Sequence, residues 1–318
     1  MNALVWRLHR NQAYVAGAAL VALGVLLLIT GITMARGYHA FLASCAAARS
    51  CGQAGQWFAG DGAITTLVDA TMAVPLLFGL FWGAPLLARE FEDGTHDLAW
   101  TQGVTRIRWL NHTILWPLLA AAGWGAALAA LVSWWRGPQN AAGAPVRLAT
   151  FTFDIQGIAP VAYAVFAVAL GITAGALLRR VLPAMAATFT VFTGLRFLIA
   201  EYARPHYLAP VSRSLPPFIG NAAPHGALVL SNATLGPDGR NYTAGLGFQQ
   251  VPPACRGYGP QASRQQNSCL ATHGFHTHIL YQPASRFWAF QGIETGLFLV
   301  LAAALIAVAY RMILTRDA

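Results

Sequence analysis

Long apolar stretches alternate with short polar stretches along this chain. Six of the apolar stretches come close to the roughly 20 residues that an α-helix needs to cross the hydrocarbon core of a bilayer. Charged residues follow each of them within a few positions. Six transmembrane helices are therefore predicted, over residues 15–34, 63–87, 110–134, 157–178, 182–200 and 288–310.

Two other segments do not have the composition of a transmembrane helix. The first fourteen residues mix Trp6 and leucines with Arg7 and Arg10, which predicts an interfacial helix leading into the membrane. Residues 201–287 are rich in Pro, Gly, Asn, Gln, Ser and His, which predicts a small region outside the bilayer. The expected fold is an all-α membrane protein with four parts: 1–14, the interfacial N-terminal helix; 15–200, helices 1–5 with a hairpin at 88–109; 201–287, the outer region; and 288–318, helix 6 with a short tail.

Composition supports the same class. The chain is 56% hydrophobic and 10% charged, whereas soluble domains are roughly 25% charged. Its net charge of +9 comes from arginine, because the sequence contains no lysine. In a membrane protein, such a charge is typical of basic cytoplasmic loops, and binding of nucleic acid is not expected.

The arginines also orient the predicted helices. With the N-terminus inside the cell, the cytoplasmic side carries most of the arginines near helix ends, as the positive-inside rule requires. That side holds Arg7, Arg10, Arg89, Arg106, Arg108, Arg179, Arg180, Arg311 and Arg316, and the short outer loops hold Arg36, Arg49, Arg136 and Arg147. We therefore expect a multi-pass protein of the cell membrane with both termini cytoplasmic and residues 201–287 extracellular.

The hairpin at residues 88–109 concentrates charge between two apolar stretches. Gly94 and Gly103 bracket a segment capable of forming a short helix, in which Thr95 suits the N-cap and Asp97 lies in the first turn. A short polar helix between two membrane helices is suited to docking a partner. The alternative is a solvated loop with capped ends.

The four cysteines all fall on the expected outer side. Disulfides persist outside the reducing cytosol, so two bridges are expected among Cys45, Cys51, Cys255 and Cys269. Four cysteines allow three connectivities, and proximity along the chain favours Cys45–Cys51 and Cys255–Cys269. A metal site near Cys269 with His273, His276 and His278 is the competing idea, but no second cysteine or acid lies close by. No metal is therefore predicted.

Three ionisable residues fall within the predicted helices. At helical rise, Arg196, Glu294 and Asp69 lie about 24, 25 and 30 Å from the nearest cytoplasmic arginines. Charges at such depth are costly against lipid, so they are expected to face the bundle or a cavity. The alternative is that they reach the headgroups. The leading hypothesis is that Arg196 pairs with Glu294 or Asp69 near an outer gate.

Motifs of soluble enzymes are missing from the sequence. It contains no Gly-x4-Gly-Lys-Ser/Thr loop, no His-Glu-x-x-His and no Gly-x-Ser-x-Gly. The chain is therefore not predicted to be an enzyme, and the energy for any driven process must be supplied from outside this chain.

The hairpin carries the most specific motif, Arg89-Glu90-x-Glu92-x-Gly94-Thr95 followed by Thr105-Arg106-x-x-Trp109. It is similar to the Glu-x-Glu-x-Gly-Thr pattern of permease subunits of type-2 ATP-binding-cassette (ABC) exporters, many of them actinobacterial. The segment 281–288 also resembles the approach to the last helix in such proteins. By topology the resemblance covers nearly the whole chain, and by motif about 30 residues.

The resemblance implies a permease subunit that works with a second permease copy or a paralogue, and it does not identify the substrate. The leading hypothesis is an exporter that moves an apolar or amphipathic compound outward. A separate cytoplasmic ABC ATPase would bind ATP and Mg and would touch the coupling hairpin; this chain itself would hold no cofactor. The coupling residues implied are Glu90, Glu92, Gly94, Thr95, Asp97 and Arg106. The main alternative is a membrane-anchored sensor or immunity protein that binds a ligand without transport, and a weaker one is a membrane enzyme using the outer histidines.

Overall fold

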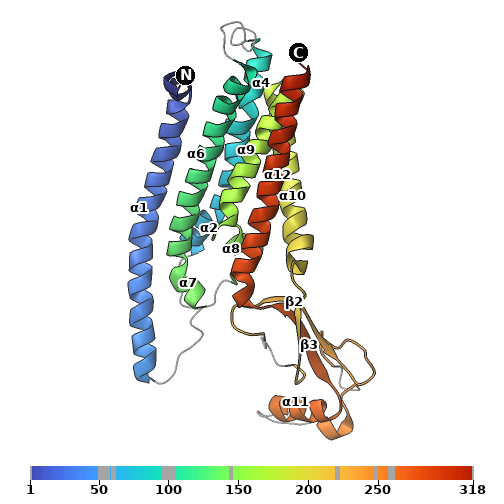
Figure 1. Ribbon diagram of the computed structural model, residues 1–318. Helices are drawn as coiled ribbons and strands as arrows, with labels where there is room; N and C mark the ends of the chain where they lie inside the picture. The colour runs from blue at the N-terminus through green and yellow to red at the C-terminus, as the bar shows by residue number, and fades with distance from the viewer. Residues whose placement is uncertain are drawn as a thin grey trace.

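The computed structural model describes residues 2–48, 58, 62–94, 105–142, 146–218, 223–246, 250–256 and 262–316. Within these residues, six helical segments are long and apolar enough to cross a membrane, as predicted. We number them spans 1–6: Gly17–Ala46, Gly62–Glu92, Leu110–Trp135, Ala159–Leu178, Val181–His206 and Ala284–Thr315. The spans lie side by side, with both chain ends at one end of the bundle and a small sheet at the other (Figure 1). These two ends are called the terminal end and the sheet end.

Several spans are built from more than one helical element. Span 1 lies in α1 (Asn2–Ala48), span 3 in α6 (Arg106–Trp135), span 4 is α9 (Ala159–Leu178) and span 6 joins the turn η7 (Ala284–Arg286) to α12 (Phe287–Arg316). Span 2 contains α2 (Gly62–Ala70), η2 (Thr71–Ala73), α3 (Val74–Phe78), the π-helical turn η3 (Gly79–Gly83) and α4 (Ala84–Glu92). Span 5 contains α10 (Val181–Leu198), the π-helical turn η4 (Ile199–Ala203) and η5 (Arg204–His206). The short helices α7 (Gly137–Ala141) and α8 (Thr150–Phe153) lie between spans 3 and 4.

The first helix differs from the prediction at both ends. α1 is continuous from Asn2, so the expected interfacial helix over residues 1–14 is not a separate element. At its other end, α1 continues to Ala48, although the sequence predicts that the helix ends at Met34 and that a polar segment follows. Residues 35–48 contain one glycine, no proline and several alanines, so nothing in this stretch favours ending the helix.

Span 4 is the centre of the bundle. In its most apolar part 78% of the residues are buried, against 17–22% in the other five spans. α9 packs against α3, η3, α4, α6, α10 and α12. This position explains why α9 is apolar on all sides, since a helix that is covered all round has no polar face.

Glycines allow spans 2 and 4 to approach closely. Gly79 and Gly83 of η3 face α9, and Gly171 and Gly175 of α9 face span 2. A Cβ on Gly79 would come within 2.6 Å of the carbonyl oxygen of Ala167, closer than a side chain can sit. Both glycine pairs have the small-x3-small spacing by which transmembrane helices pack backbone against backbone.

A three-stranded antiparallel sheet lies outside the bundle, where the sequence predicts no strands. β1 (Val211–Leu215) and β2 (Leu228–Leu235) both pair with β3 (His276–Gln282), giving the order β1-β3-β2. The turn η6 (Pro253–Cys255) and the helix α11 (Ala262–Thr272) pack beside it around a small apolar core.

Polar contacts fix the sheet to the ends of spans 5 and 6. The Gln282 side chain at the end of β3 donates to the carbonyl oxygens of Pro205 and Leu208, at 2.9 and 2.7 Å. Arg286 donates to the Ala209 carbonyl at 2.7 Å and to the Gln282 side chain at 2.6 Å. The sheet therefore cannot turn without moving the chain that leaves span 5.

Candidate functional site

Four charged side chains meet inside the bundle at its sheet end. Arg196 and Arg204 come from span 5, Glu294 from α12, and Asp154 from the turn after α8. Arg204 Nη2 lies 2.6 Å from Asp154 Oδ1 and 2.8 Å from Glu294 Oε1, and its Nε lies 3.0 Å from Glu294 Oε2. Arg196 Nη2 lies 2.5 Å from Asp154 Oδ2, and its Nη1 lies 3.4 Å from Glu294 Oε1. We call these four residues the ion cluster.

The ion cluster is almost fully withdrawn from solvent. The side chain of Arg196 is 12% exposed and those of the other three members are 3% exposed or less. Two positive and two negative charges balance each other, which offsets the penalty of several kcal/mol for burying each ion. Removing one member leaves a buried charge without compensation, a loss of about 3–5 kcal/mol.

Aromatic side chains complete the site. Tyr163 donates to Glu294 Oε1 at 2.6 Å and Tyr207 to Glu294 Oε2 at 3.2 Å. Burial, and then the Glu294 carboxylate, raise the pKa of Tyr207, so its hydroxyl stays protonated and keeps donating. The guanidinium of Arg196 lies 3.5 Å from the ring centre of Tyr163, where its charge meets the π face. The cluster thereby joins spans 4, 5 and 6.

Gln291 of α12 holds the chain segment that carries Asp154. Its Oε1 accepts from the backbone N–H groups of Ile158 and Ala159 at 2.9 and 2.7 Å, where α9 begins, and its Nε2 donates to the Phe153 carbonyl at 3.2 Å. Gly157 in the turn has φ +74°, and a Cβ there would lie 2.6 Å from Gln291 Oε1. Only glycine therefore fits this turn without displacing the glutamine.

Of the two partners considered for Arg196, Glu294 lies beside it in the structure and Asp69 does not. Asp69 forms an ion pair with Arg136 at the end of α6, because span 2 borders span 3 there. The sequence alone does not single out Asp154 and Arg204, since its composition predicts a loop over residues 136–154 and a fifth helix that ends at Ala200. The clue in the sequence was the second arginine shortly after Arg196, followed at once by Pro205.

The pair of Asp69 and Arg136 belongs to a second buried polar group. Arg136 is 1% exposed, and its Nη1 donates to Gln139 Oε1 at 3.1 Å. Gln139 in turn reaches the sulfur of Met34 at 3.8 Å, and Trp135 donates to Thr30 at 3.1 Å. These contacts join spans 1, 2 and 3 at the same end of the bundle as the ion cluster.

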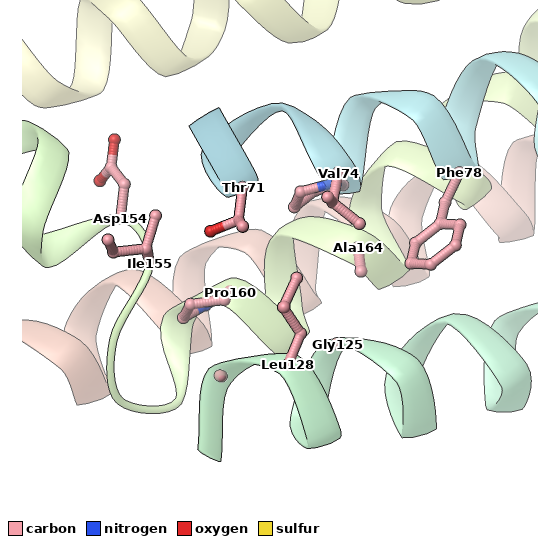
Figure 2. A pocket seen from close by; sticks show the side chains of 11 residues that line it. Thr71, Val74, Phe78, Gly125, Leu128, Asp154, Ile155, Pro160 and Ala164 are labelled. Atoms are coloured by element: carbon pink, nitrogen blue, oxygen red, sulfur yellow. The ribbon is translucent and has the colours of Figure 1, made fainter. Parts of the chain in front are cut away.

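A narrow, mostly apolar pocket borders the ion cluster at Asp154. Figure 2 shows Asp154 and Ile155 at one end of it and Phe78 at the other, with Thr71 and Leu128 between. Its walls come from span 2, α6 and the beginning of α9. It has room for about one water molecule, so nothing larger enters here unless the spans separate.

At the terminal end, the structure describes part of the predicted coupling hairpin. Glu90 and Glu92 end α4, and Gly94 follows with φ +69°. Glu92 Oε2 accepts from the backbone N–H of Val181 at 3.0 Å, which caps the beginning of α10. Arg106 begins α6. Thr95 and Asp97 lie outside the described residues.

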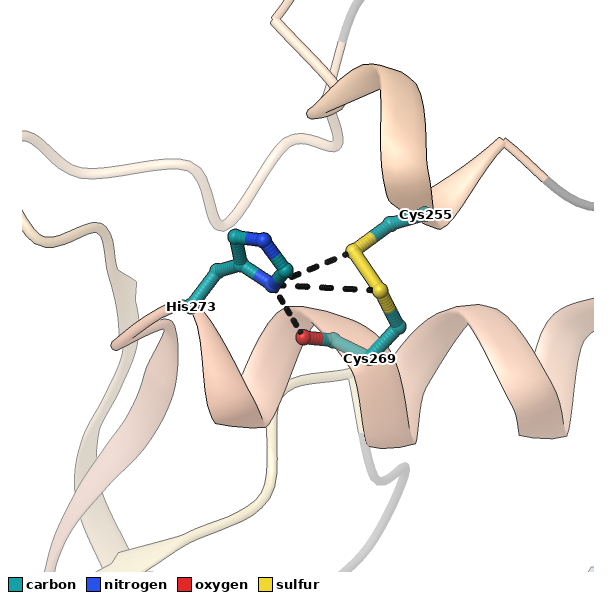
Figure 3. A group of neighbouring side chains, drawn as sticks. All are labelled: Cys255, Cys269 and His273. Atoms are coloured by element: carbon teal, nitrogen blue, oxygen red, sulfur yellow. Dashed lines mark hydrogen bonds between the residues drawn. A yellow bond between two sulfur atoms is a disulfide. The ribbon is translucent and has the colours of Figure 1, made fainter.

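The cysteines and histidines singled out in the sequence can be placed in part. Cys255 and Cys269 form a disulfide, and His273 Nδ1 lies 3.5 and 3.8 Å from the two sulfurs (Figure 3). Because both sulfurs are bonded to each other, neither is a thiolate that could bind a metal together with His273. Cys45 is also disulfide-bonded, and its expected partner Cys51 lies outside the described residues.

Six apolar spans, with a buried and charge-balanced ion cluster among spans 4, 5 and 6, define a multi-pass membrane protein. The family model described as "ABC-2 membrane transporter related" matches residues 17–204, more than half of the chain and all of spans 1–4. The chain belongs to this family and is a membrane permease component of an ABC transporter. No curated protein and no solved structure matches it.

Proposed function

We propose that this protein is the permease of an ATP-driven exporter and moves an apolar or amphipathic compound outward. The single observation that carries the proposal is the family match over residues 17–204, which makes the chain a transporter subunit and not only a membrane anchor. The sequence supplies no ATPase motif, so a separate cytoplasmic ABC ATPase with ATP and Mg drives the cycle.

The terminal end faces the cytoplasm in this proposal. The arginine distribution supports that orientation, since Arg179 and Arg180 lie in the turn at this end. The hairpin after span 2 then meets the ATPase through Glu90, Glu92, Gly94, Thr95, Asp97 and Arg106. Two permease copies, or this chain and a paralogue, form the membrane unit.

The ion cluster closes the outer side of the translocation path. It joins three spans, lies directly beneath the sheet and borders the apolar pocket through Asp154. An amphipathic compound can pass only when these spans part, and parting them requires the charges to exchange partners. This view keeps the outer-gate role expected for Arg196 and Glu294, whereas Asp69 works in the neighbouring polar group.

Affinity purification of the tagged permease from its native membranes tests the proposal. An ABC ATPase should co-purify, and the reconstituted complex should hydrolyse ATP faster when amphipathic compounds are added. A permease that inserts correctly but retains no ATPase would instead favour a sensor or immunity protein that binds a ligand through its outer region.

A further inference from the structure

Arg196 and Arg204 stand eight positions apart in span 5, and this spacing does not suit a regular α-helix. At 3.6 residues per turn, side chains eight positions apart point about 80° away from each other. Both guanidinium groups nevertheless contact the same two carboxylates, Asp154 and Glu294. The backbone between Arg196 and Arg204 therefore departs from regular α-helical geometry and brings the two side chains to the same face of the helix.

The π-helical turn η4 (Ile199–Ala203) makes this correction. The backbone N–H of Arg204 bonds to the carbonyl of Ile199, five residues earlier, in place of the carbonyl of Ala200. A π turn accommodates one additional residue, so the eight positions cover the angle of about seven α-helical ones. The two arginines then point within about 20° of each other, which places both on the ion cluster.

A single π turn is a local alternative to the α-helical hydrogen-bond pattern. If Arg204 N–H bonded to Ala200 instead of Ile199, the chain after the turn would rotate by about 100° and shift by about 1.5 Å relative to α10. The two arginines could then no longer share Asp154 and Glu294. One element would thus have two discrete arrangements, as switching elements in proteins do.

We propose that η4 is the switch of the outer closure: in its π form both arginines hold the ion cluster, and in its α form Arg204 leaves the cluster. This inference rests on the proposed function, because it explains how the outer closure opens. The contacts of Gln282 with Pro205 and Leu208 carry the same movement to the sheet, since these carbonyls directly follow the turn.

Deleting one residue from η4 should remove the π turn, and with it the alternative register, while leaving the ion cluster intact. Without Ala200, the two arginines are seven positions apart in a regular α-helix and still share a face. The cluster stays intact, but the alternative register is no longer available. Deletion of Tyr202, which is 67% exposed, removes one residue from the same turn and provides a second variant.

Double electron–electron resonance on the full-length permease in nanodiscs, without ATPase or nucleotide, measures the register. Nitroxide labels are placed on Phe197→Cys, before the turn, and Ser212→Cys, in the sheet; both positions are exposed. A 100° rotation moves a side chain at the helix surface by up to about 9 Å, given a helix radius of about 5–6 Å. Cys45, Cys255 and Cys269 are disulfide-bonded, and the unsubstituted protein serves as the labelling control.

Asp154→Asn weakens the hold on both arginines. We expect it to raise the ratio of the second distance population to the first by about tenfold, equivalent to about 1.4 kcal/mol. In the background of the Ala200 or Tyr202 deletion, Asp154→Asn should give one population. A single population in Asp154→Asn overturns the proposal, and so does a second population that persists in the deletion backgrounds. Failure of both deletions to insert also overturns it, because a deletion that keeps the arginines aligned should be tolerated. None of these results depends on transport, so they stay separate from a failure to find an ATPase.

Discussion

Arg204 and Glu294 lie 90 positions apart in the chain and form a bidentate ion pair. Nε and Nη2 of the arginine lie 3.0 and 2.8 Å from the two carboxylate oxygens. This bidentate geometry is the strongest form of arginine–carboxylate contact, and lysine cannot reproduce it. It fixes the end of span 5 to span 6 at the base of the sheet. The stability of the whole sheet end should therefore depend on this pair.

Glu294→Gln should lower the free energy of unfolding by about 3–5 kcal/mol, because two buried arginines then share only Asp154. Glu294→Gln combined with Arg204→Met should recover part of the loss, since the second change removes the unpaired charge. Thermal unfolding in detergent measures both. The matched control is Arg240→Gln, which breaks an exposed pair with Asp238 and should change little. A double variant whose loss equals the sum of the losses of Glu294→Gln and Arg204→Met measured singly would show that the two charges are not coupled.

The rate of transport should depend on the charges of Arg196 and Glu294. Neutralising Arg196 alone should impair export of a substrate, and neutralising Glu294 in addition should restore part of it. Uptake into inside-out vesicles measures this directly. Unchanged transport in both variants would place the outer closure elsewhere in the bundle.

Glu92 should contribute to coupling and to stability by separable routes. Glu92→Ala removes the cap on α10, at a cost of about 0.5–2 kcal/mol, and with it the hydrogen bond that joins the end of α4 to the beginning of α10. Arg180 has the extended backbone of an N-cap residue, so Arg180→Asp in the Glu92→Ala background supplies a new cap. The double variant should regain thermal stability but not substrate-stimulated ATPase activity. Recovery of both would mean that Glu92 acts only as a cap.

Gly175→Ala should disturb the contact between spans 2 and 4. Its Cβ would lie 2.7 Å from the Ala84 carbonyl oxygen, a backbone atom that cannot move aside alone, and overpacking of this kind costs about 1–3 kcal/mol. Gly194→Ala is the matched control, because a Cβ at that position meets nothing within 4 Å. The melting temperatures of the two variants should differ, and identical values would argue against close helix contact.

Topology and the disulfide can be checked in intact cells. Cysteines introduced at Gly94 and Arg180 should be shielded from an impermeant maleimide, whereas one at Asn241 should react. Labelling at Gly94 from outside would reverse the proposed orientation.

Non-reducing mass spectrometry should find Cys255 joined to Cys269, a bond with a sequence separation of 14 that adds roughly 3 kcal/mol in the chain-entropy model. Free thiols at both positions would contradict this prediction.

The six spans could be predicted because their apolar stretches are long and lack charge at the positions that face lipid. The cluster could be predicted only in part. Arg196 and Glu294 stand out as charges inside apolar stretches, but Asp154 lies in a Gly- and Ala-rich connection and reads as an ordinary loop residue. Its burial depends on Gln291, which comes from a distant span and holds the turn in place.

Two other features are not readable from local sequence. The turn Ile199–Ala203 contains ordinary helix-forming residues, and nothing in its sequence predicts the π geometry that lets Arg196 and Arg204 both contact Asp154. β2 mixes apolar residues with Ser231 and Asn232 around a bulge, so its period-two pattern is interrupted. In both cases tertiary contacts decide the local structure.

The ion cluster cannot form until Glu294 has been synthesised, because its two arginines come earlier in the chain. Arg204 emerges from the ribosome 90 residues before Glu294, which corresponds to about 5–18 s at the usual 5–20 residues per second. During that interval, span 5 carries two arginines with Asp154 as their only acidic cluster partner. A helix with an unbalanced charge enters lipid reluctantly, so the insertion machinery must retain span 5 until span 6 arrives. Mutations of Glu294 should therefore reduce the amount of protein that reaches the membrane as well as the stability of the protein that does.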